Sequence, residues 1–187
     1  MSLMENKVCI EYYDGRYAKE SKLSKQRRIP FYKTIGELIN EKDNVLDIGC
    51  GNGLLAYFSK YKKYTGLDFS TVAIEQAKNL QLKNTDFKCV DFFLIDFNEI
   101  KYDTVIMTEV LEHIEDDIML IKKVKKNKTI ILSVPNNEPI MEDGKPRGYP
   151  IHQRAYSIKT LKKRYKQIKF EKIFVFQNWI IAKGIKI

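Results

Sequence analysis

The 187-residue chain has few of the residues on which disulfide frameworks, thiolate metal sites and membrane spans depend. Its three cysteines, Cys9, Cys50 and Cys89, are widely spaced and form no Cys-x-x-Cys pair, which favours free thiols in a reducing cytoplasm. Histidine occurs only twice, as His113 and His152. No apolar run approaches the ~20 residues of a membrane span, and the charged N-terminus lacks a signal-peptide core. We therefore expect a soluble cytoplasmic protein.

Two common phosphate-binding signatures are also missing. The glycines from Gly49 to Gly53 are spaced Gly-x-Gly-x-Gly, not Gly-x-Gly-x-x-Gly, which argues against NAD or FAD. No Gly-Lys-Ser/Thr follows them, so a P-loop is excluded. An apolar run, Val45–Ile48, leads into the glycines, and a helical pattern follows from Leu54 to Phe58. A strand, a tight turn and a helix N-terminus with free N–H groups predict a nucleotide-type cofactor site.

Length, composition and charge limit the number of domains and the kinds of partner that the chain can have. With 44% hydrophobic residues, the chain suits one domain over residues 1–187, in which about 1–40 precede a core of 41–187. The net charge of +9 is uneven: residues 1–121 carry 16 Lys and Arg against 20 Asp and Glu, and residues 122–187 carry 17 against 4. Such asymmetry can signal an anionic partner. The basic residues are spread over several predicted elements, however, which favours a solvated Lys-rich surface.

Strand-like and helical segments alternate after residue 40. Strands are expected at Val45–Ile48, Tyr64–Leu67, Thr85–Val90, Tyr102–Met107 and Lys128–Val134, with a terminal hairpin of Phe170–Phe176 and Trp179–Ala182. Such alternation predicts an α/β fold with a mostly parallel sheet and helices on both faces. The ligand crevice of such a sheet lies at the strands' carboxyl ends. The residues expected there are Gly49–Gly53, Asp68, Asp91, Thr108–Glu109 and Asn136.

The remaining segments are less regular. Residues 9–17 are expected to form an ordered loop or short helix, and residues 26–40 a helix with Pro30 in its first turn. Further helices are expected after the N-cap Ser70, over 116–126 and over 157–165. Residues 136–156 form a long loop rich in proline and glycine. A loop of about 20 residues is uncommon unless functional, which makes it a candidate lid or substrate loop.

Taken together, these motifs strongly resemble the class I S-adenosylmethionine-dependent methyltransferases, especially the ubiquinone-biosynthesis-like subgroup (methyltransferase type 11/12). Val-Leu-Asp-Ile-Gly-Cys-Gly-Asn-Gly looks like the first motif of that family, and Thr-Gly-Leu-Asp-Phe-Ser like its ribose-binding segment. Tyr-Asp-Thr-Val-Ile-Met-Thr-Glu-Val-Leu-Glu-His-Ile and Ile-Leu-Ser-Val-Pro-Asn resemble its fourth and fifth strands. The resemblance implies a Rossmann-like three-layer sandwich with S-adenosylmethionine as cofactor. Its seven strands would follow the order 3-2-1-4-5-7-6, with strand 7 antiparallel.

The resemblance also assigns cofactor contacts. Those with the methionine part are assigned to Asp47, Gly49, Cys50, Gly51, Thr108 and Arg16. Those with the ribose and adenine are assigned to Asp68, Phe69, Asp91 and Phe92. Arg16 lies among Tyr12, Tyr13 and Tyr17, which resemble an N-terminal cover over the cofactor. A guanidinium there could pair with the methionine carboxylate.

Methyl transfer from a sulfonium is a direct displacement, so the enzyme mainly aligns the reacting atoms and needs no covalent nucleophile. A hydroxyl or amine acceptor would gain from a general base, and histidine suits this role near neutral pH. The candidates are His152, in a His-x-Arg-x-Tyr-Ser segment that resembles the subgroup, and His113. We favour His152 because loops at a pocket edge carry acceptor contacts. Packing of Tyr156 and capping by Ser157 explain part of the same segment.

A metal site is the alternative for these residues. Glu109, Glu112 and His113 are spaced for one face of a helical turn, and with His152 they could bind a metal ion. The small-RNA 3′-terminal 2′-O-methyltransferases have such an arrangement. Glu-Val-Leu-Glu-His is widespread in ordinary methyltransferases of this kind, however, so we expect no metal.

The sequence thus predicts a methyltransferase that modifies an oxygen or nitrogen atom, less readily carbon, of a small molecule. It is expected to be a monomer or weak homodimer without membrane contact. One alternative is an RNA methyltransferase, including a metal-assisted 2′-O type, which the basic C-terminal third would suit. Another is a cofactor-binding protein without catalysis.

Overall fold

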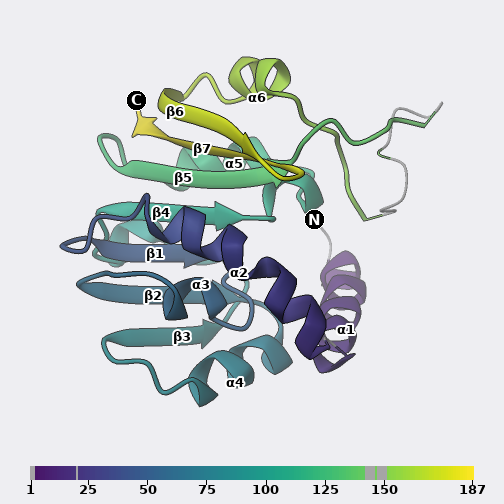
Figure 1. The fold of residues 1–187 in the computed structure, drawn as a ribbon, viewed down its shortest axis with the longest axis vertical. Coiled ribbons are helices and arrows are strands. Elements are labelled where there is room, and N and C mark those ends of the chain that lie inside the picture. The colour runs from purple at the N-terminus through teal and green to yellow at the C-terminus, as the bar shows by residue number, and fades with distance from the viewer. Residues whose placement is uncertain (1–2, 20, 142–145, 147–150) are drawn as a thin grey trace. The chain divides into compact units, whose positions relative to one another are not determined.

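The computed structural model describes residues 3–19, 21–141, 146 and 151–187. Its strands are β1 (Asn44–Ile48), β2 (Lys63–Asp68), β3 (Thr85–Cys89), β4 (Thr104–Thr108), β5 (Thr129–Pro135), β6 (Ile168–Phe176) and β7 (Trp179–Lys186). They follow the order β3-β2-β1-β4-β5-β7-β6, and β7 is antiparallel to β5 and β6 (Figure 1). The predicted fold class and strand order are confirmed. The chain divides into two compact units, Met1–Ile95 and Asp96–Ile187, and its action as a single domain stays a prediction.

In the first unit, β2 pairs in parallel with β1 on one side and with β3 on the other. All five residues of β1 are buried, as expected for an apolar strand covered on both faces. Ile48, the last residue of β1, lies opposite Leu67, and Asp68 follows Leu67 at the end of β2. The register therefore places the start of the glycine turn and Asp68 at the same edge of the sheet.

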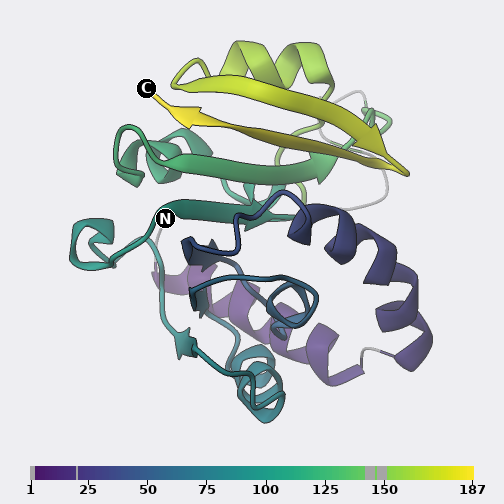
Figure 2. The ribbon, with the colours of Figure 1, turned by 60° about the vertical axis from the view of Figure 1, so that its left-hand side comes forward.

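The helices of the first unit are α1 (Leu3–Lys19), α2 (Lys22–Gly36), α3 (Leu54–Tyr57) and α4 (Thr71–Asn79). Helix α4 contacts β2 and β3, α1 contacts α4, and α2 contacts α3. Figure 2 shows α1 alongside α4 from a second direction. The predicted N-cap of α4 is confirmed, because the Ser70 hydroxyl accepts a hydrogen bond from the Ala73 N–H at 3.1 Å.

Two predictions for the N-terminal segment were wrong in detail. Residues 9–17, expected as a loop or short helix, lie inside the 17-residue α1. Helix α2 begins at Lys22, so Pro30 lies in the helix interior, not in the first turn. Proline lacks the N–H that would close a helical hydrogen bond there, and the helix continues past it to Gly36. The sequence pattern thus underestimated the length of α1, and it placed the second helix four residues too far along the chain, since α2 has the expected 15 residues but ends at Gly36 instead of residue 40.

The second unit contains a parallel pair, β4 and β5, followed by the antiparallel β7 and β6. Its helices are α5 (Asp117–Lys123) and α6 (Ile158–Arg164), with short 3-10 turns η1 (Phe97–Glu99) and η2 (Leu111–His113). Figure 2 shows β6 and β7 as a long twisted hairpin. Helix α6 begins at a capping box in which Ser157 and Thr160 each bond the other's backbone N–H. None of the helices described is long and apolar enough to cross a membrane.

A buried carboxylate joins α5 to α6. Asp117 accepts hydrogen bonds from Arg164 Nε at 2.7 Å and from Tyr156 Oη at 3.1 Å, and Tyr165 Oη also donates to it. Arg154 Nη1 lies 3.2 Å from the same carboxylate. Burial alone would raise the pKa of Asp117, but these hydrogen bonds and positive charges lower it below its usual value. Two cations of the basic C-terminal third therefore have structural partners.

The structure describes the side chains of two of the three cysteines. Cys50 is buried and Cys89 is exposed, and both are free thiols. The Cys9 side chain lies outside the described part of the chain, as do residues 142–145 and 147–150 of the long loop.

Candidate functional site

The backbone of the glycine turn after β1 has a conformation that residues with a Cβ would strain. Gly49 and Gly51 have φ values of 71° and 53°, in the left-handed region that favours glycine. A Cβ on Gly51 would lie 2.3 Å from the hydroxyl oxygen of Tyr17, a residue of α1. The turn and the N-terminal helix are therefore in close contact, and the turn has no space for a larger residue at position 51.

The turn uses its own N–H groups internally, which the sequence did not predict. Gly49 and Cys50 both donate to the Leu67 carbonyl, at 2.7 and 3.1 Å, and the Gly51 N–H donates to Asp68 Oδ2 at 2.8 Å. The helix that follows, α3, has only four residues, so its dipole is small. The free N–H groups that the sequence predicts belong to the start of α3 and not to these three residues, so their contact with a ligand stays a prediction. The turn allows a ligand's close approach, but these three N–H groups are already used within the fold, which makes it less suited to phosphate, in line with the glycine spacing that argues against NAD.

Asp68 lies at the end of β2 with its carboxylate held in place. Asp68 Oδ1 accepts the Ser70 N–H at 2.9 Å and Oδ2 accepts the Gly51 N–H, and the residue is 6% exposed. Burial raises the pKa of Asp68, although these two hydrogen bonds oppose the shift. Each carboxylate oxygen can accept a further hydrogen bond. An oriented acceptor pair of this kind suits two neighbouring hydroxyls.

Asp47 is a second buried carboxylate, within β1. Tyr64 Oη donates to its Oδ2 at 2.5 Å, whereas its Oδ1 is buried and has no hydrogen-bond partner among the described residues. Burial raises the pKa of Asp47 to about 7, against the opposing hydrogen bond from Tyr64. A buried acceptor that lacks a donor is costly unless a ligand supplies one. A ligand ammonium group would satisfy both its charge and its hydrogen-bonding capacity.

Within the first unit, Asp14 joins helix α1 to the start of α4. The sequence motifs did not indicate this residue. Its Oδ1 accepts the Ser70 hydroxyl at 2.5 Å and its Oδ2 accepts the Thr71 hydroxyl at 3.1 Å, at the N-terminus of α4. In addition, the Gln76 amide donates to the Tyr17 carbonyl at 3.1 Å. These contacts join segments more than 50 residues apart, so no local pattern could indicate them. They place the predicted N-terminal cover next to the glycine turn.

Aromatic rings gather near the ends of β2 and β3. The Tyr13 and Phe69 rings meet edge to face at 5.4 Å between centroids, and the Phe69 and Phe92 rings are 6.2 Å apart. Asp91 Oδ1 accepts the Phe93 N–H at 2.9 Å. Arg16 lies with its guanidinium 5.9 Å from the Tyr13 ring centre and is exposed. Phe69 and Phe92, two of the residues predicted for the adenine, thus belong to an aromatic cluster. The individual roles of Phe69, Asp91, Phe92 and Arg16 stay predictions.

In the second unit, the end of β4 differs from the helical turn that the sequence predicted. Thr108 is the last residue of β4 and is buried, and its proposed cofactor contact stays a prediction. Glu109 has a φ of 57° and accepts a hydrogen bond from Ser133 Oγ at 3.3 Å. Only Leu111–His113 form a 3-10 turn. Glu109 therefore does not share a helical face with Glu112 and His113, because a left-handed residue cannot belong to the helix.

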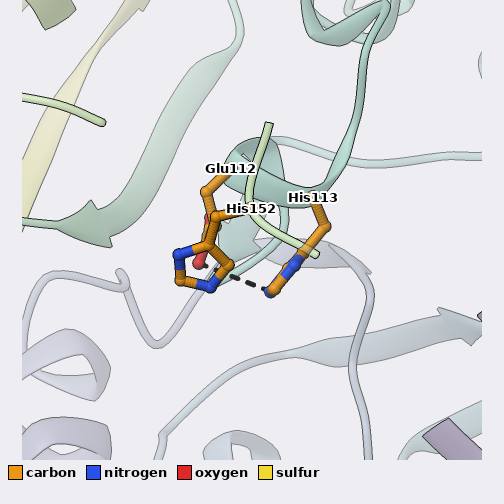
Figure 3. A group of neighbouring side chains, drawn as sticks. All are labelled: Glu112, His113 and His152. Atoms are coloured by element: carbon orange, nitrogen blue, oxygen red, sulfur yellow. Dashed lines mark ion pairs between the residues drawn. The ribbon is translucent and has the colours of Figure 1, made fainter. Parts of the chain in front are cut away.

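Glu112, His113 and His152 do come together (Figure 3). His113 Nε2 lies 3.7 Å from Glu112 Oε1, and the two imidazole rings are 4.6 Å apart at an interplanar angle of 70°. His152 Nδ1 lies 2.9 Å from both carboxylate oxygens of Glu138. The side chains of Glu112 and His152 are 0% and 6% exposed. Glu138 was missed, because a loop residue 14 positions from its partner gives no periodic signal.

The loop that carries His152 is attached to the η2 turn by several hydrogen bonds. The Gln153 N–H donates to the Glu112 carbonyl at 2.7 Å. The Arg154 guanidinium donates to the Leu111 carbonyl at 3.2 Å and the Glu115 carbonyl at 2.8 Å. Arg154 therefore serves to position the loop, and these bonds hold the segment that follows His152 against the turn that contains His113.

Comparison with known proteins agrees with this geometry. The model of a family described as "Methyltransferase domain" matches residues 17–176. The ubiquinone biosynthesis O-methyltransferase of Alkalilimnicola ehrlichii is 29% identical over 109 residues, which are 53% of this chain and 44% of that protein. The chain thus spans less than half the length of this curated relative.

Solved structures show the same fold. The DhpI–SAH complex has a TM-score of 0.72 and 17% identity, with 98% of this chain and 97% of that chain covered. The magnesium protoporphyrin IX methyltransferase of Synechocystis PCC 6803 with bound SAM has a TM-score of 0.67 and 18% identity, with 100% and 99% covered. Because the family model matches most of the chain, and these solved structures share its fold, the chain belongs to the methyltransferase-domain family.

Proposed function

We propose that this enzyme methylates a hydroxyl or amine group of a small molecule. The observation that carries the proposal is the carboxylate-supported histidine of the second unit, where Glu138 lies 2.9 Å from His152 Nδ1 beside Glu112 and His113. A hydroxyl or amine must lose a proton during methylation, and this group of side chains is suited to accept or position it.

The first unit supplies the proposed cofactor site. S-adenosylmethionine, when bound, provides the activated methyl group on its sulfonium. Asp68 would accept the two ribose hydroxyls, because two backbone N–H groups already hold its carboxylate in position. Asp47 would receive the amino group at its otherwise unpaired Oδ1. The aromatic cluster around Phe69 would pack against the adenine.

The second unit supplies the proposed acceptor contacts. A carboxylate that accepts the Nδ1–H of a histidine orients the ring and fixes its tautomer, so that Nε2 is the nitrogen that can accept a proton. Glu138 would do this for His152. We therefore propose that His152 takes the acceptor's proton and that His113 helps to orient the acceptor. A carbon acceptor would need a more acidic C–H bond, which makes oxygen or nitrogen the better candidates.

The structural roles of several basic residues support a small molecule, and not RNA, as the acceptor of the methyl group. Arg154 and Arg164 hold Asp117. Lys169 and Lys172 lie on β6, the edge strand of the sheet, where lysine protects against edge-to-edge association. These cations have functions within the fold, and their presence does not require a phosphate backbone as partner.

A methyl-transfer screen tests the proposal. Wild-type enzyme and labelled S-adenosylmethionine are incubated with hydroxyl- and amine-bearing metabolites and, separately, with RNA. We expect label on a small molecule, a loss of about 100-fold or more in kcat for His152→Gln, and a smaller loss for Glu138→Gln. Label on RNA, with a steep dependence of binding on salt, would instead establish the alternative. Cofactor binding without label on any acceptor would favour the non-catalytic class.

A further inference from the structure

We propose that Glu112, His113 and His152 bind one divalent transition-metal ion. Each side chain offers one ligand atom, and the three atoms lie within 4.8 Å of one another (Figure 3). The sequence led us to expect no metal, and the four-residue alternative included Glu109. The structure assigns a different set, without Glu109 and with Glu138 behind His152.

The distances match those of a site that closes on an ion. Ligands about 2.1 Å from one metal ion lie roughly 3–3.5 Å from one another. His113 Nε2 and Glu112 Oε1 are 3.7 Å apart, which is longer than a hydrogen bond but close to that separation. The other distances between ligand atoms, which are at most 4.8 Å, would have to shorten through small rotations of the side chains. The planes of the two imidazole rings are inclined at 70°, which permits their nitrogens to converge.

Glu138 provides the partner that metal-binding histidines usually have. A histidine ligand commonly donates its other ring N–H to a carboxylate, which fixes the tautomer and strengthens the bond to the metal. Here the carboxylate lies 2.9 Å from His152 Nδ1, which assigns Nε2 as the ligand atom of this histidine. Glu138 is largely buried, with 11% of its side chain exposed, which makes a chance surface contact a poor explanation.

The three ligands are held in place before any ion binds. Glu112 and His113 lie in η2, and the loop with His152 is attached to the same turn through Gln153 and Arg154. The start of the loop is fixed as well, because the Asn137 N–H donates to the Tyr156 carbonyl at 2.7 Å. A rigid scaffold of this kind lowers the cost of bringing ligands together.

The ligand types indicate the class of ion. Two imidazoles and one carboxylate suit zinc, manganese, cobalt or iron, whereas magnesium and calcium prefer oxygen ligands alone. Three protein ligands leave coordination positions open for water or for an oxygen atom of a substrate. If the enzyme methylates a hydroxyl group, as proposed, an acceptor bound at the ion would lose its proton more easily. His152 would then be a ligand in the metal-bound enzyme, and its proposed role as a base would apply to the metal-free enzyme. The binding proposal itself does not depend on methyl transfer.

The small number of histidines permits a direct test. The untagged 187-residue chain has two imidazoles, His113 and His152, so its long-range ¹H–¹⁵N spectrum contains two imidazole spin systems. We expect Zn²⁺ to shift both of them and to saturate at one equivalent, with the Nε2 signal of each changing most. Zinc binding that leaves either imidazole unshifted would overturn the proposal.

Matched variants assign the site. Glu112→Gln should weaken zinc binding at least 100-fold, and Glu138→Gln about 10- to 100-fold. The control is Glu109→Gln, three residues from Glu112, which should bind zinc as tightly as the wild type. Unchanged affinity in Glu112→Gln, or an equal loss in Glu109→Gln, would contradict the assigned ligands.

The visible absorption of bound Co²⁺ also shows whether a cysteine thiolate is one of its ligands. Co²⁺ in the proposed site should give visible d–d absorption without a thiolate charge-transfer band, because no cysteine belongs to the set. A strong thiolate band, or d–d absorption that persists in His152→Gln, would place the ion elsewhere and refute the proposal. These measurements need no acceptor, so their failure is distinguishable from a failure to detect methyl transfer.

Discussion

Burial of the Asp47 carboxylate lowers the free energy of unfolding by an amount that should depend on pH. Its pKa is raised from 3.8 to about 7, mainly by burial. The native state therefore holds a proton that the unfolded chain releases at lower pH, and stability falls as pH rises from about 4 to 7. Because one pKa unit corresponds to about 1.4 kcal/mol, the penalty above neutral pH approaches about 4 kcal/mol as an upper value.

Asp47→Asn removes this titration while keeping the shape of the side chain. We expect the variant to exceed the wild type in free energy of unfolding at about pH 8, by at most about 4 kcal/mol. The advantage should shrink to about 1–2 kcal/mol near pH 5, where the native carboxyl is protonated. Urea unfolding of both proteins across this range, without ligand, measures the difference.

The same substitution should weaken binding of S-adenosylhomocysteine. An ammonium group that faces Asp47 Oδ1 would lose a charged hydrogen bond worth about 1.5–3 kcal/mol, which corresponds to a roughly 10- to 150-fold higher Kd. A variant that is less stable than the wild type at pH 8, or a difference that does not change with pH, would refute the reasoning. So would tighter ligand binding, because the carboxylate would then serve only the fold.

Three further predictions follow from the contacts. Gly51→Ala should cost about 1–2 kcal/mol for its left-handed backbone and displace Tyr17, whereas Gly15→Ala, whose Cβ meets nothing within 4 Å, should be neutral or slightly stabilising in urea unfolding. Arg164→Ala should destabilise by about 3 kcal/mol or more, because it leaves the buried Asp117 charge with fewer partners, and a loss below about 1 kcal/mol would contradict that role. Asp14→Asn should weaken the hold of α1 on α4, so limited proteolysis within α1 should be faster than in wild type, and equal rates would show that other contacts suffice.

The sequence predicted the sheet well because its strands are short apolar runs that end in recognisable residues. Val45–Ile48 leads into glycines that only a tight turn explains, and Asp68 follows the next strand at the same edge. Parallel strands covered by helices bring these ends together whatever the details of the loops. For this reason the pattern predicted the fold class and a nucleotide-type cofactor site, and the resemblance of the motifs to a known family added the identity of the cofactor.

The contacts that the sequence did not predict depend on chain segments that meet only in the fold. Asp14 reaches Ser70 across 56 positions, and Glu138 reaches His152 from the other end of a loop. The glycine turn's N–H groups bond to β2, which a local reading of the turn could not reveal. Glu109 follows the spacing of a helical turn, but its left-handed backbone removes it from that turn. Spacing indicates which residues can share a face, and the backbone decides whether they do.

Calorimetric titration of the wild-type protein with S-adenosylhomocysteine tests the central claim most directly. The account predicts saturable binding at one site per chain, and at least 10-fold weaker binding by Asp68→Asn, which alters the carboxylate held by Gly51 and Ser70. Asp86→Asn, which changes a partly exposed carboxylate of β3 that pairs with Lys88, serves as the matched control and should bind as the wild type does. Absence of binding to the wild type, or equal affinity in Asp68→Asn, would contradict the proposed cofactor site.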